Sequence, residues 1–387
     1  MPEAVIVDTV RTPIGRAFKG SLAALRPDEM GAFVIDQLLE RNPEVDPELV
    51  QEVYAGCGMP QGLEAFNVAR IMVLLSEKLP MSVAGTTVSR YCASSLEAIR
   101  QAGNAVKAGE GDVYIASGIE WVSRFNERTE PAGADDQNPK LQGNNGDPDA
   151  YISMGDTAVN VAKKFGVKRE DMDRYAQRSQ ELAVESQESG FFEREIVPVE
   201  LPDGTKVDKD DGPRASSSYE KLAELPEAFD GGGGVTAGNS CPLNDGAAAV
   251  LVMSETKAKE LGLTPRAKIF TSATSALEPE IMGVAPIGAI HNVLERAGMS
   301  ITDVDRVELN EAFAAQVIPI MEKCEIPLEK MNAHGGAIAL GHPFGMTGAR
   351  IMGTLLNGLE TDDKAIGIET MCVAGGQGQA MIVERLN

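Results

Sequence analysis

The sequence lacks most features of a secreted, membrane-spanning or nucleic-acid-binding protein. Its five cysteines are an odd number without regular spacing, which favours free thiols in a reducing compartment. No apolar run is long enough to span a bilayer, and the first residues lack the pattern of a secretory signal. The net charge of −23 argues against nucleic acid or an anionic membrane as the main partner. We therefore expect a cytoplasmic protein that binds neither.

Ligand patterns for metals and dinucleotides are also missing. The five cysteines and three histidines show no Cys-x-x-Cys pair and no zinc-ligand spacing, so we expect no metal site. The glycine-rich stretches lack the strand–GxGxxG–helix context of a dinucleotide site, and we expect no bound cofactor. A chain of 387 residues with 43% hydrophobic side chains is globular and long enough for two or three domains.

Short β-rich runs alternate with segments of helical period, which favours an α/β fold with largely buried sheets. The predicted strands are Ala4–Thr9, Glu52–Ala55, Val83–Val88, Asp112–Gly118, Arg306–Leu309, Ala365–Glu369 and Gln379–Glu384. The predicted helices are Ser94–Lys107, Gly155–Phe165, Arg169–Ser189 and Thr347–Leu359. A similar order of elements occurs early and late, so we interpret the chain as two related α/β halves. Each half is expected to present one reactive turn to a shared site.

The division of the chain follows from this order. We assign residues 1–118 and 243–265 to the N-terminal half and residues 266–387 to the C-terminal half. Residues 119–242 lie between them and begin with a polar stretch, 123–150, rich in Asp, Asn, Gly and Pro. Long loops in compact enzymes are more often functional than incidental, so we interpret residues 119–242 as a loop domain over the site.

Cys92 is the first candidate for covalent chemistry. It lies at a predicted strand-to-helix junction in S-R-Y-C-A-S-S, where the unpaired backbone N–H groups of a helix N-terminus favour the thiolate. The same N–H groups can stabilise an oxyanion on an attached acyl group. A lone cysteine is more often structural, and the junction makes the two interpretations about equal.

His342 lies between Gly341 and Pro343 and is one of only three histidines. A histidine on an exposed Gly/Pro turn is poorly explained by core packing, and its ordinary pKa suits proton transfer near neutral pH. His334 competes for this role, and spacing alone does not choose between them. His291 is interpreted as an ordinary surface residue.

Cys372 follows a predicted apolar strand and precedes the turn V-A-G-G-Q-G. A thiol there can act as an acid or base, but it can equally fill space at a β-turn. Cys57 and Cys241 have similar glycine- or proline-rich surroundings. Cys324, on a predicted helix, is interpreted as buried and inert.

At these residues the chain resembles the thiolase family, and the resemblance covers essentially its whole length. The shared motifs are V-R-T-P-I-G at Val10–Gly15, the Cys92 turn, T-A-G-N-S-C-P-L-N-D-G-A-A-A at Thr236–Ala249, N-E-A-F-A from Asn310, G-G-A-I-A-L-G-H-P at Gly335–Pro343, and the Cys372 turn. The resemblance implies a five-layered αβαβα fold, a loop domain over the active site, and a homodimer or homotetramer.

The resemblance also implies roles for individual residues. Cys92 resembles the nucleophile that takes the acyl group, and His342 the base that activates it. Cys372 resembles the acid/base that protonates the leaving acetyl-CoA carbanion. Asn310 resembles the residue that holds a water beside His342. The backbone N–H groups of Cys92 and Ala374 resemble the second oxyanion hole.

Substrate contacts are implied at five further positions. The positions that match coenzyme A or acyl-pocket contacts are Arg214, Ser240, Cys241, Met154 and Phe313. The chain departs from the common pattern at three points. Ser89 replaces a frequent Asn, Ala374 a frequent Gly, and Cys241 a frequent Ser. None of these changes removes a catalytic group, so they bear on substrate fit.

The predicted activity is that of an acetyl-CoA C-acyltransferase. It would cleave 3-ketoacyl-CoA with coenzyme A through an acyl-cysteine intermediate, in fatty-acid β-oxidation. One alternative is a short-chain acetyl-CoA C-acetyltransferase that makes acetoacetyl-CoA. Another is a condensing enzyme of the ketosynthase or hydroxymethylglutaryl-CoA synthase type, although such relatives typically have histidine in place of Cys372. A third is a non-catalytic acyl-CoA binder or a subunit of a multienzyme β-oxidation complex.

Overall fold

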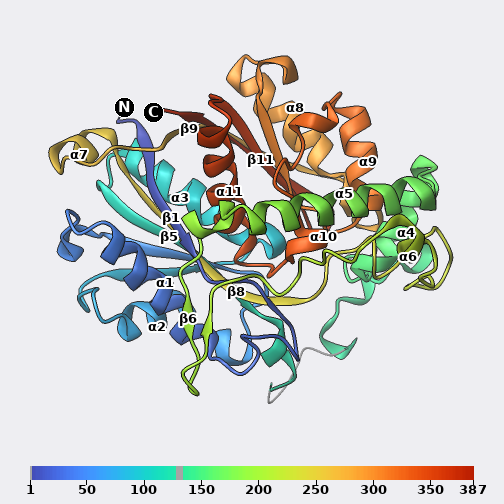
Figure 1. Cartoon of the computed structure of the whole chain (residues 1–387), viewed down its shortest axis with the longest axis horizontal. Helices are drawn as coiled ribbons and strands as arrows, with labels where there is room; N and C mark the ends of the chain where they lie inside the picture. Colours follow the sequence, from blue (N-terminus) through green and yellow to red (C-terminus); the bar gives the residue numbers. More distant parts are fainter. Residues whose placement is uncertain (1, 128–133) are drawn as a thin grey trace.

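The computed structural model describes residues 2–127 and 134–387 (Figure 1). The segment 128–133 of the expected loop domain lies outside the described residues. The strands are β1 (Ala4–Arg11), β2 (Gly15–Arg16), β3 (Glu52–Cys57), β4 (Ala84–Val88), β5 (Val113–Trp121), β6 (Val199–Glu200), β7 (Lys206–Val207), β8 (Asn244–Ser254), β9 (Ala267–Ala276), β10 (Arg306–Leu309), β11 (Ile366–Val373) and β12 (Gln377–Arg385). The α-helices are α1 (Pro27–Arg41), α2 (Val68–Leu75), α3 (Ser94–Ala108), α4 (Met154–Phe165), α5 (Arg169–Glu188), α6 (Tyr219–Ala223), α7 (Glu255–Glu260), α8 (Pro286–Ala297), α9 (Ala314–Lys323), α10 (Ala337–Leu340) and α11 (Thr347–Thr361).

Two mixed sheets of similar design form the centre of the molecule. The N-terminal half has the order β4-β3-β5-β8-β1, with parallel pairs up to β5 and antiparallel pairs beyond it. The C-terminal half has the order β10-β11-β12-β9, with one parallel pair followed by antiparallel pairs. Within the described part of the chain, two residue pairs, Val5 with Lys268 and Ile6 with Ala267, join the sheets through β1 and β9. The predicted structural repeat is confirmed in this arrangement.

The structure has five layers, alternately of helices and of sheet, and three hydrophobic clusters pack these layers together. One cluster joins α1 and α2 to the outer face of the N-terminal sheet. A second fills the space between the two sheets, where α3 and α11 lie (Figure 1). The third joins the outer face of the C-terminal sheet to α8 and α9. The strands alternate between layers, so Met371 and Val373 face the central layer while Cys372 faces the outer one. The predicted five-layered αβαβα fold is confirmed.

The two central helices meet at a close backbone contact. A Cβ atom on Gly348 of α11 would lie 2.3 Å from the backbone nitrogen of Leu96 in α3, so only glycine allows this approach. Beside it, the backbone N–H of Ala349 donates to Ser95 Oγ at 2.9 Å. These contacts hold the start of α11, which follows the His342 turn, against the start of α3, which follows Cys92.

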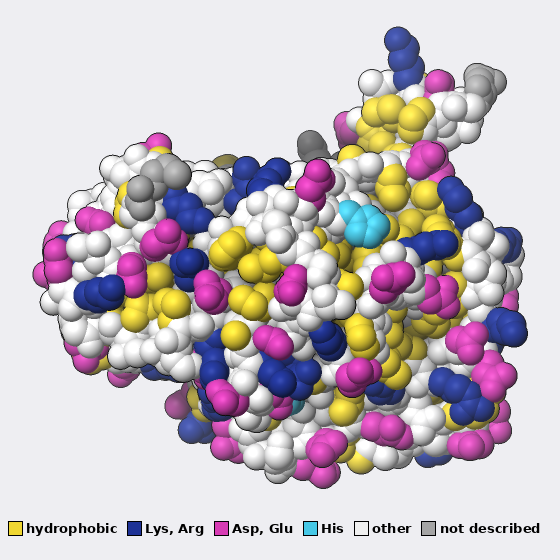
Figure 2. Space-filling view, turned by 90° about the horizontal axis from the view of Figure 1, so that it is seen from above, with side chains coloured by type: hydrophobic (Ala, Val, Ile, Leu, Met, Phe, Trp, Pro, Cys, Tyr) yellow, Lys and Arg dark blue, Asp and Glu magenta, His cyan; other side chains and the backbone are white. Residues whose placement is uncertain are grey.

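Most predicted elements are present, with ends that differ by a few residues. The strands β8 and β9 were not among the predicted ones, although β8 is buried along its whole length. Between the halves the chain forms α4, α5, α6 and the hairpin β6–β7, and α5 packs against α9 and α10. No helix within residues 2–127 and 134–387 is long and apolar enough to cross a membrane. On the face in Figure 2, Lys and Arg are interspersed with Asp and Glu.

Candidate active site

Cys92 lies in a single 3₁₀ turn between β4 and α3, so the predicted strand–cysteine–helix junction is confirmed. Tyr91 has a φ of +43°, a left-handed conformation that is uncommon for an aromatic residue and often marks functional turns. The Ser94 hydroxyl stabilises this turn, because it donates to the Tyr91 carbonyl at 2.6 Å and accepts from the Arg90 N–H at 2.9 Å. The turn packs against β11 and α11 of the other half.

Burial controls the protonation of Cys92. Only 8% of the residue is exposed, and desolvation raises the pKa of its thiol well above the ordinary value. Cys372, Cys241 and Glu120 raise this pKa further. The backbone at the helix N-terminus lowers the pKa of Cys92, as predicted, but desolvation has the larger effect and the net shift is upward.

The His342 turn is buried, not exposed as the Gly/Pro context predicted. The histidine is 2% exposed, and burial, followed by Arg350, lowers its pKa to about 3. Its backbone N–H donates to Asn244 Oδ1 at 3.0 Å. Gly341 has a φ of +114°, and a Cβ there would lie 2.5 Å from the Asn244 side chain. The glycine that suggested a surface turn thus allows the turn to pack under β8.

The structure brings His342 and Asn310 together. Asn310 Nδ2 lies 3.2 Å from His342 Nε2, and the Asn310 backbone N–H donates to the Thr370 carbonyl at 3.0 Å. Asn310 thus sits at the end of β10, beside the strand that carries Cys372. Its Oδ1 is buried without a hydrogen-bond partner among the described residues.

Cys372 lies near the end of β11 and is fully buried. Gln316, in the first turn of α9, donates through Nε2 to the Cys372 sulfur at 3.0 Å. Burial raises the pKa of Cys372, the hydrogen bond from Gln316 lowers it, and the net pKa is about 11. Ala374 follows in the turn, before Gly375 and Gly376 with φ near +80°. Gln316 was not predicted, because nothing in its neighbouring sequence marks it as functional.

Two buried carboxylates that the sequence analysis missed hold the site's loops in place. Glu120 accepts from the backbone N–H groups of Gly58 and Gly345 at 2.7 and 2.8 Å, which ties the loop after β3 to the loop after His342. Glu311, next to Asn310, accepts from the hydroxyls of Tyr175 and Ser179 at 2.8 and 2.6 Å. Glu311 also accepts from Asn332 Nδ2 and the Ile338 N–H. It thereby joins α5 to the turn that leads to His342.

The competing histidines have other surroundings. His334 stacks on the Phe191 ring with 3.6 Å between ring centroids, and its Nδ1 lies 3.3 Å from Ser186 Oγ. Burial lowers its pKa to about 4. His291 is exposed on α8. Of the three histidines, His342 alone contacts another predicted catalytic side chain, so the geometry favours it as the base.

The remaining cysteines differ in setting. Cys57 is fully buried at the end of β3, and burial raises its pKa well above the ordinary value. Cys324 caps the end of α9 and is 5% exposed, in agreement with its interpretation as a buried residue. All five thiols are free.

A pocket of about 500 Å³ contains three of the five predicted substrate-binding residues. Arg214, Ser240 and Cys241 line it, together with Arg16 and Lys19, which the sequence analysis missed. Burial raises the pKa of Cys241 to about 12.

Phe313 and Met154 are not among the residues that line this pocket. Phe313 meets the pocket-lining Phe229 edge to face, with 6.2 Å between the ring centroids. Met154 packs against the same hydrophobic cluster at the start of α4. Phe313 thus contacts a residue of the pocket wall, and Met154 packs against the hydrophobic cluster that includes Phe313.

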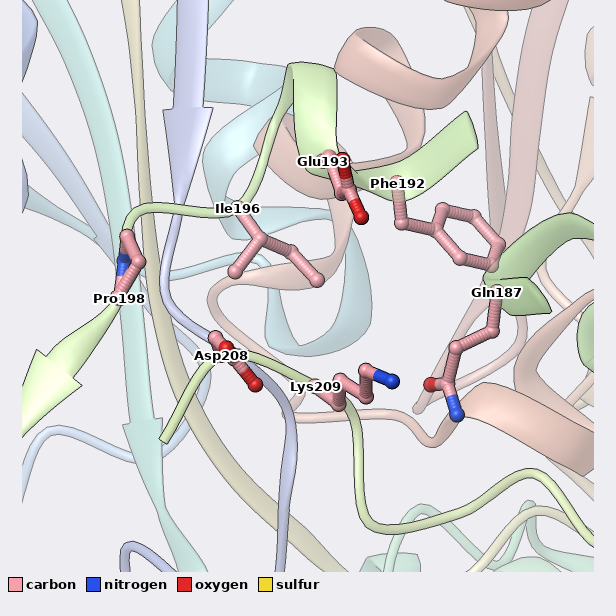
Figure 3. A pocket seen from close by; sticks show the side chains of 7 residues that line it. All are labelled: Gln187, Phe192, Glu193, Ile196, Pro198, Asp208 and Lys209. Atoms are coloured by element: carbon pink, nitrogen blue, oxygen red, sulfur yellow. The ribbon is translucent and has the colours of Figure 1, made fainter. Parts of the chain in front are cut away.

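A second hollow of about 280 Å³ has a different character (Figure 3). Its lining residues are Gln187, Phe192, Glu193, Ile196, Pro198, Asp208 and Lys209. Among the described residues, its lining includes side chains of both charges and neither cysteine nor histidine.

Comparison with known proteins identifies the family. The chain matches the models of the thiolase N-terminal domain over residues 4–256 and the thiolase C-terminal domain over residues 263–385. It is 43% identical over 394 residues to a 3-ketoacyl-CoA thiolase of Idiomarina loihiensis, and the match covers 100% of both chains. It is 42% identical over 407 residues to a 3-oxoadipyl-CoA/3-oxo-5,6-dehydrosuberyl-CoA thiolase of Escherichia coli, again with 100% of both chains covered.

Solved structures give the same result. The acetyl-CoA acetyltransferase of Bacillus anthracis has a TM-score of 0.91 and 37% identity, covering 100% of this chain and 99% of that one. The dimeric peroxisomal thiolase of Saccharomyces cerevisiae has a TM-score of 0.93 and 36% identity, covering 100% and 98%. With both domain models matched in order and full-length relatives above 40% identity, this chain belongs to the thiolase family.

Proposed function

We propose that this protein cleaves 3-ketoacyl-CoA with coenzyme A, giving acetyl-CoA and a shortened acyl-CoA. The observation that carries the proposal is the convergence of reactive groups from both halves. The Cys92 turn packs against β11, which carries Cys372, and the His342–Asn310 pair lies at the end of the strand beside Cys372. Names of full-length relatives support the substrate class.

The first half-reaction forms an acyl-enzyme. The Cys92 sulfur attacks the keto carbon while its proton passes to His342. The carbon–carbon bond then breaks, and its electron pair becomes the enolate of acetyl-CoA. Cys372 gives its proton to the enolate carbon, and the Gln316 amide stabilises the resulting thiolate.

The second half-reaction returns the enzyme to its starting state. The thiol of coenzyme A gives its proton to the Cys372 thiolate and attacks the acyl carbon. The carbon–sulfur bond to Cys92 breaks, and Cys92 recovers its proton from His342. Backbone N–H groups of Cys92 and Ala374 are the proposed donors to the oxyanion of each tetrahedral intermediate. The backbone N–H of Cys92 lies in the 3₁₀ turn at the start of α3, which supports this role.

The pocket beside Cys241 is the proposed coenzyme A site. It collects Arg16, Lys19 and Arg214 in a protein whose net charge is −23. Arg16 and Arg214 line the same pocket, and burial, followed by Arg16, lowers the pKa of Arg214. A bound phosphate would relieve their repulsion. Arg214 and Cys241 come from residues 119–242, which supports the proposal that this segment is a loop domain over the site.

The acyl range is a separate part of the proposal. The named relatives comprise a general 3-ketoacyl-CoA thiolase, a 3-oxoadipyl-CoA thiolase and an acetyltransferase. The same groups run cleavage or condensation, because every step above is reversible. We propose cleavage of fatty-acyl substrates in β-oxidation, with short-chain condensation to acetoacetyl-CoA as the second candidate. The five free thiols support a cytoplasmic location.

We also propose that the protein is a homodimer formed through β4. This strand lies at the edge of its sheet, and an unpaired edge is a template for another strand. Around it, Phe66 is 92% exposed, Met81 75% and Tyr91 45%. We call these three side chains and β4 the β4 surface. Tyr91 precedes Cys92, so a second copy docked here would lie beside the site, and a related structure is described as dimeric.

The direct test is a cleavage assay with coenzyme A and three substrates: acetoacetyl-CoA, a long-chain 3-ketoacyl-CoA and 3-oxoadipyl-CoA. Wild type is compared with Cys92→Ala. We expect cleavage by wild type and its loss in the variant, with the relative rates giving the acyl range. Absence of cleavage of all three by a folded wild type, or retained cleavage by Cys92→Ala, would overturn the proposal.

A further inference from the structure

The hydroxyl of Thr347 lies between the imidazole of His342 and a backbone carbonyl. Its Oγ1 is 2.7 Å from His342 Nδ1 and 2.7 Å from the carbonyl oxygen of Pro343. Thr347 is 1% exposed, and it is the first residue of α11, five positions after His342. The three atoms are therefore held at short distances inside the protein.

These distances decide where the protons are. A hydroxyl has one proton to donate, and a carbonyl oxygen can only accept, so the Thr347 proton must lie on the line to Pro343. The hydroxyl then presents a lone pair to His342 Nδ1, and a hydrogen bond there requires a proton on Nδ1. If the hydroxyl were turned toward Nδ1, two oxygen atoms would face each other at 2.7 Å with no proton between them.

The contact of the second imidazole nitrogen, Nε2, agrees with this assignment. With its proton on Nδ1, a neutral His342 has a free lone pair on Nε2. Asn310 Nδ2 lies 3.2 Å from that nitrogen and can donate to it. Both contacts of the ring are then satisfied by one tautomer.

We propose that Thr347 is a positioning residue that fixes the Nδ1–H tautomer of His342 and so makes Nε2 the base of the site. The inference rests on the proposed function, since it names the atom that takes the proton from Cys92. In this step the S–H bond of Cys92 breaks, the N–H bond at Nε2 forms, and sulfur bonds to the carbonyl carbon while the C=O π electrons move to the oxygen, which becomes the oxyanion. The Nδ1–H bond to Thr347 is kept throughout.

The choice of a hydroxyl matters for charge. A carboxylate at this position would stabilise the imidazolium, whereas a neutral hydroxyl orients the ring without doing so. Burial and Arg350 already lower the pKa of His342. The tautomer is therefore fixed while the ring stays neutral, and the imidazolium exists only while the Cys92 sulfur is bonded to substrate carbon.

Thr347→Val and Thr347→Ser form a matched pair for the test. Valine keeps the shape but loses the hydroxyl, and serine keeps the hydroxyl. The tautomer is read by long-range ¹H–¹⁵N NMR on protein labelled at histidine, without substrate. Only three histidines contribute signals, and His342→Asn assigns the relevant set. We expect an unprotonated Nε2 in wild type and Thr347→Ser, and a substantial population of the Nε2–H tautomer in Thr347→Val.

Kinetics provide the second measurement. We expect Thr347→Val to lower kcat for thiolysis by about 10- to 100-fold, with little change in the KM for acyl-CoA or in melting temperature, and serine to restore most of the loss. A protonated Nε2 in wild type would overturn the inference. So would a fall in kcat in Thr347→Val without a change of tautomer, since that would be a structural effect. The NMR measurement needs no substrate, so it tests the tautomer even if wild type shows no thiolysis. Failure of the proposed function can therefore be distinguished from failure of this inference.

Discussion

At the scale of single residues, burial governs the protonation of the reactive groups. It raises the pKa of Cys92 and lowers that of His342, so both groups are neutral near pH 7 in the free protein. A neutral pair avoids an isolated buried charge. Charge then separates only during attack on the substrate, when the oxyanion donors can stabilise it.

This neutral pair predicts the pH dependence of Cys92 alkylation. Because its pKa is raised, the thiolate fraction is small at neutral pH and grows about tenfold per pH unit. We expect the rate of modification by iodoacetamide to rise without a plateau between about pH 6 and pH 9. The rate is measured by mass spectrometry of the Cys92 peptide. A plateau below about pH 8 would indicate a preformed thiolate and contradict the neutral pair.

A second prediction concerns Gln316. Gln316→Leu removes the donor to the Cys372 sulfur and should raise the pKa of that thiol further. Loss of one such bond is worth about tenfold in rate. We expect exchange of the acetyl-CoA methyl protons with solvent, which needs Cys372, to slow by that factor.

The control for Gln316 is the alkylation of Cys92 by iodoacetamide, which needs no proton from Cys372. Its rate in Gln316→Leu should stay close to that of wild type. Equal losses of methyl-proton exchange and of Cys92 alkylation would mean that Gln316 acts on the fold as a whole and not on Cys372.

At the scale of elements, α3 and α11 bring the two halves together. Each begins just after a reactive turn, and Gly348 lets their backbones approach. The position of Cys92 relative to His342 therefore depends on this contact more than on either turn alone.

Two glycines of α11 make a matched pair for testing the contact. Gly348→Ala would place a Cβ 2.3 Å from the Leu96 nitrogen, and overpacking of this kind costs about 1–3 kcal/mol or more. In Gly358→Ala the nearest atom, on His334, lies 3.4 Å away, so the helix gains about 0.5–1 kcal/mol. We expect urea unfolding to show lower stability for the first variant and unchanged or higher stability for the second. Equal stability of the two would contradict the close contact.

Elements with a clear hydrophobic periodicity were predicted from the sequence. Elements whose neighbouring residues suggest a different structure or a different degree of burial were missed. The strand β8 begins with N-D-G-A-A-A, which is typical of turns or helices, yet it lies in the middle of a sheet buried on both faces. The glycine and proline beside His342 suggested exposure, but Asn244 and the neighbouring strand cover that turn. Gln316, Glu120 and Thr347 escaped notice because their partners are distant in sequence.

At the scale of the whole molecule, an acidic protein contains a small cationic pocket, and β4 is one of the two edge strands of the sheet, with β10 at the opposite end. The pocket holds three of the 35 basic side chains, which supports local recognition of phosphate despite the net charge of −23. The edge strand β4 ends three residues before Tyr91, so the proposed dimer interface lies next to the turn that contains Cys92.

The β4 surface predicts how assembly can be broken. Phe66→Asp places a charge where a second copy would dock, and a buried unpaired charge weakens association strongly. We expect light scattering after size-exclusion chromatography to show a shift from dimer to monomer. Leu328→Asp, at a side chain that is 46% exposed outside the β4 surface, is the control and should remain dimeric. A monomeric wild type, or an unchanged dimer in Phe66→Asp, would contradict the proposed interface.

The most direct test of the central claim, that Cys92 carries the acyl group, is the mass of the protein after mixing with acetyl-CoA and rapid acid quench. We predict a gain of one acetyl group, mapped to the peptide that contains Cys92, absent in Cys92→Ala, and removed by added coenzyme A. An acetyl group on Cys372 or Cys241 instead, or none on wild type that cleaves substrate, would contradict the account.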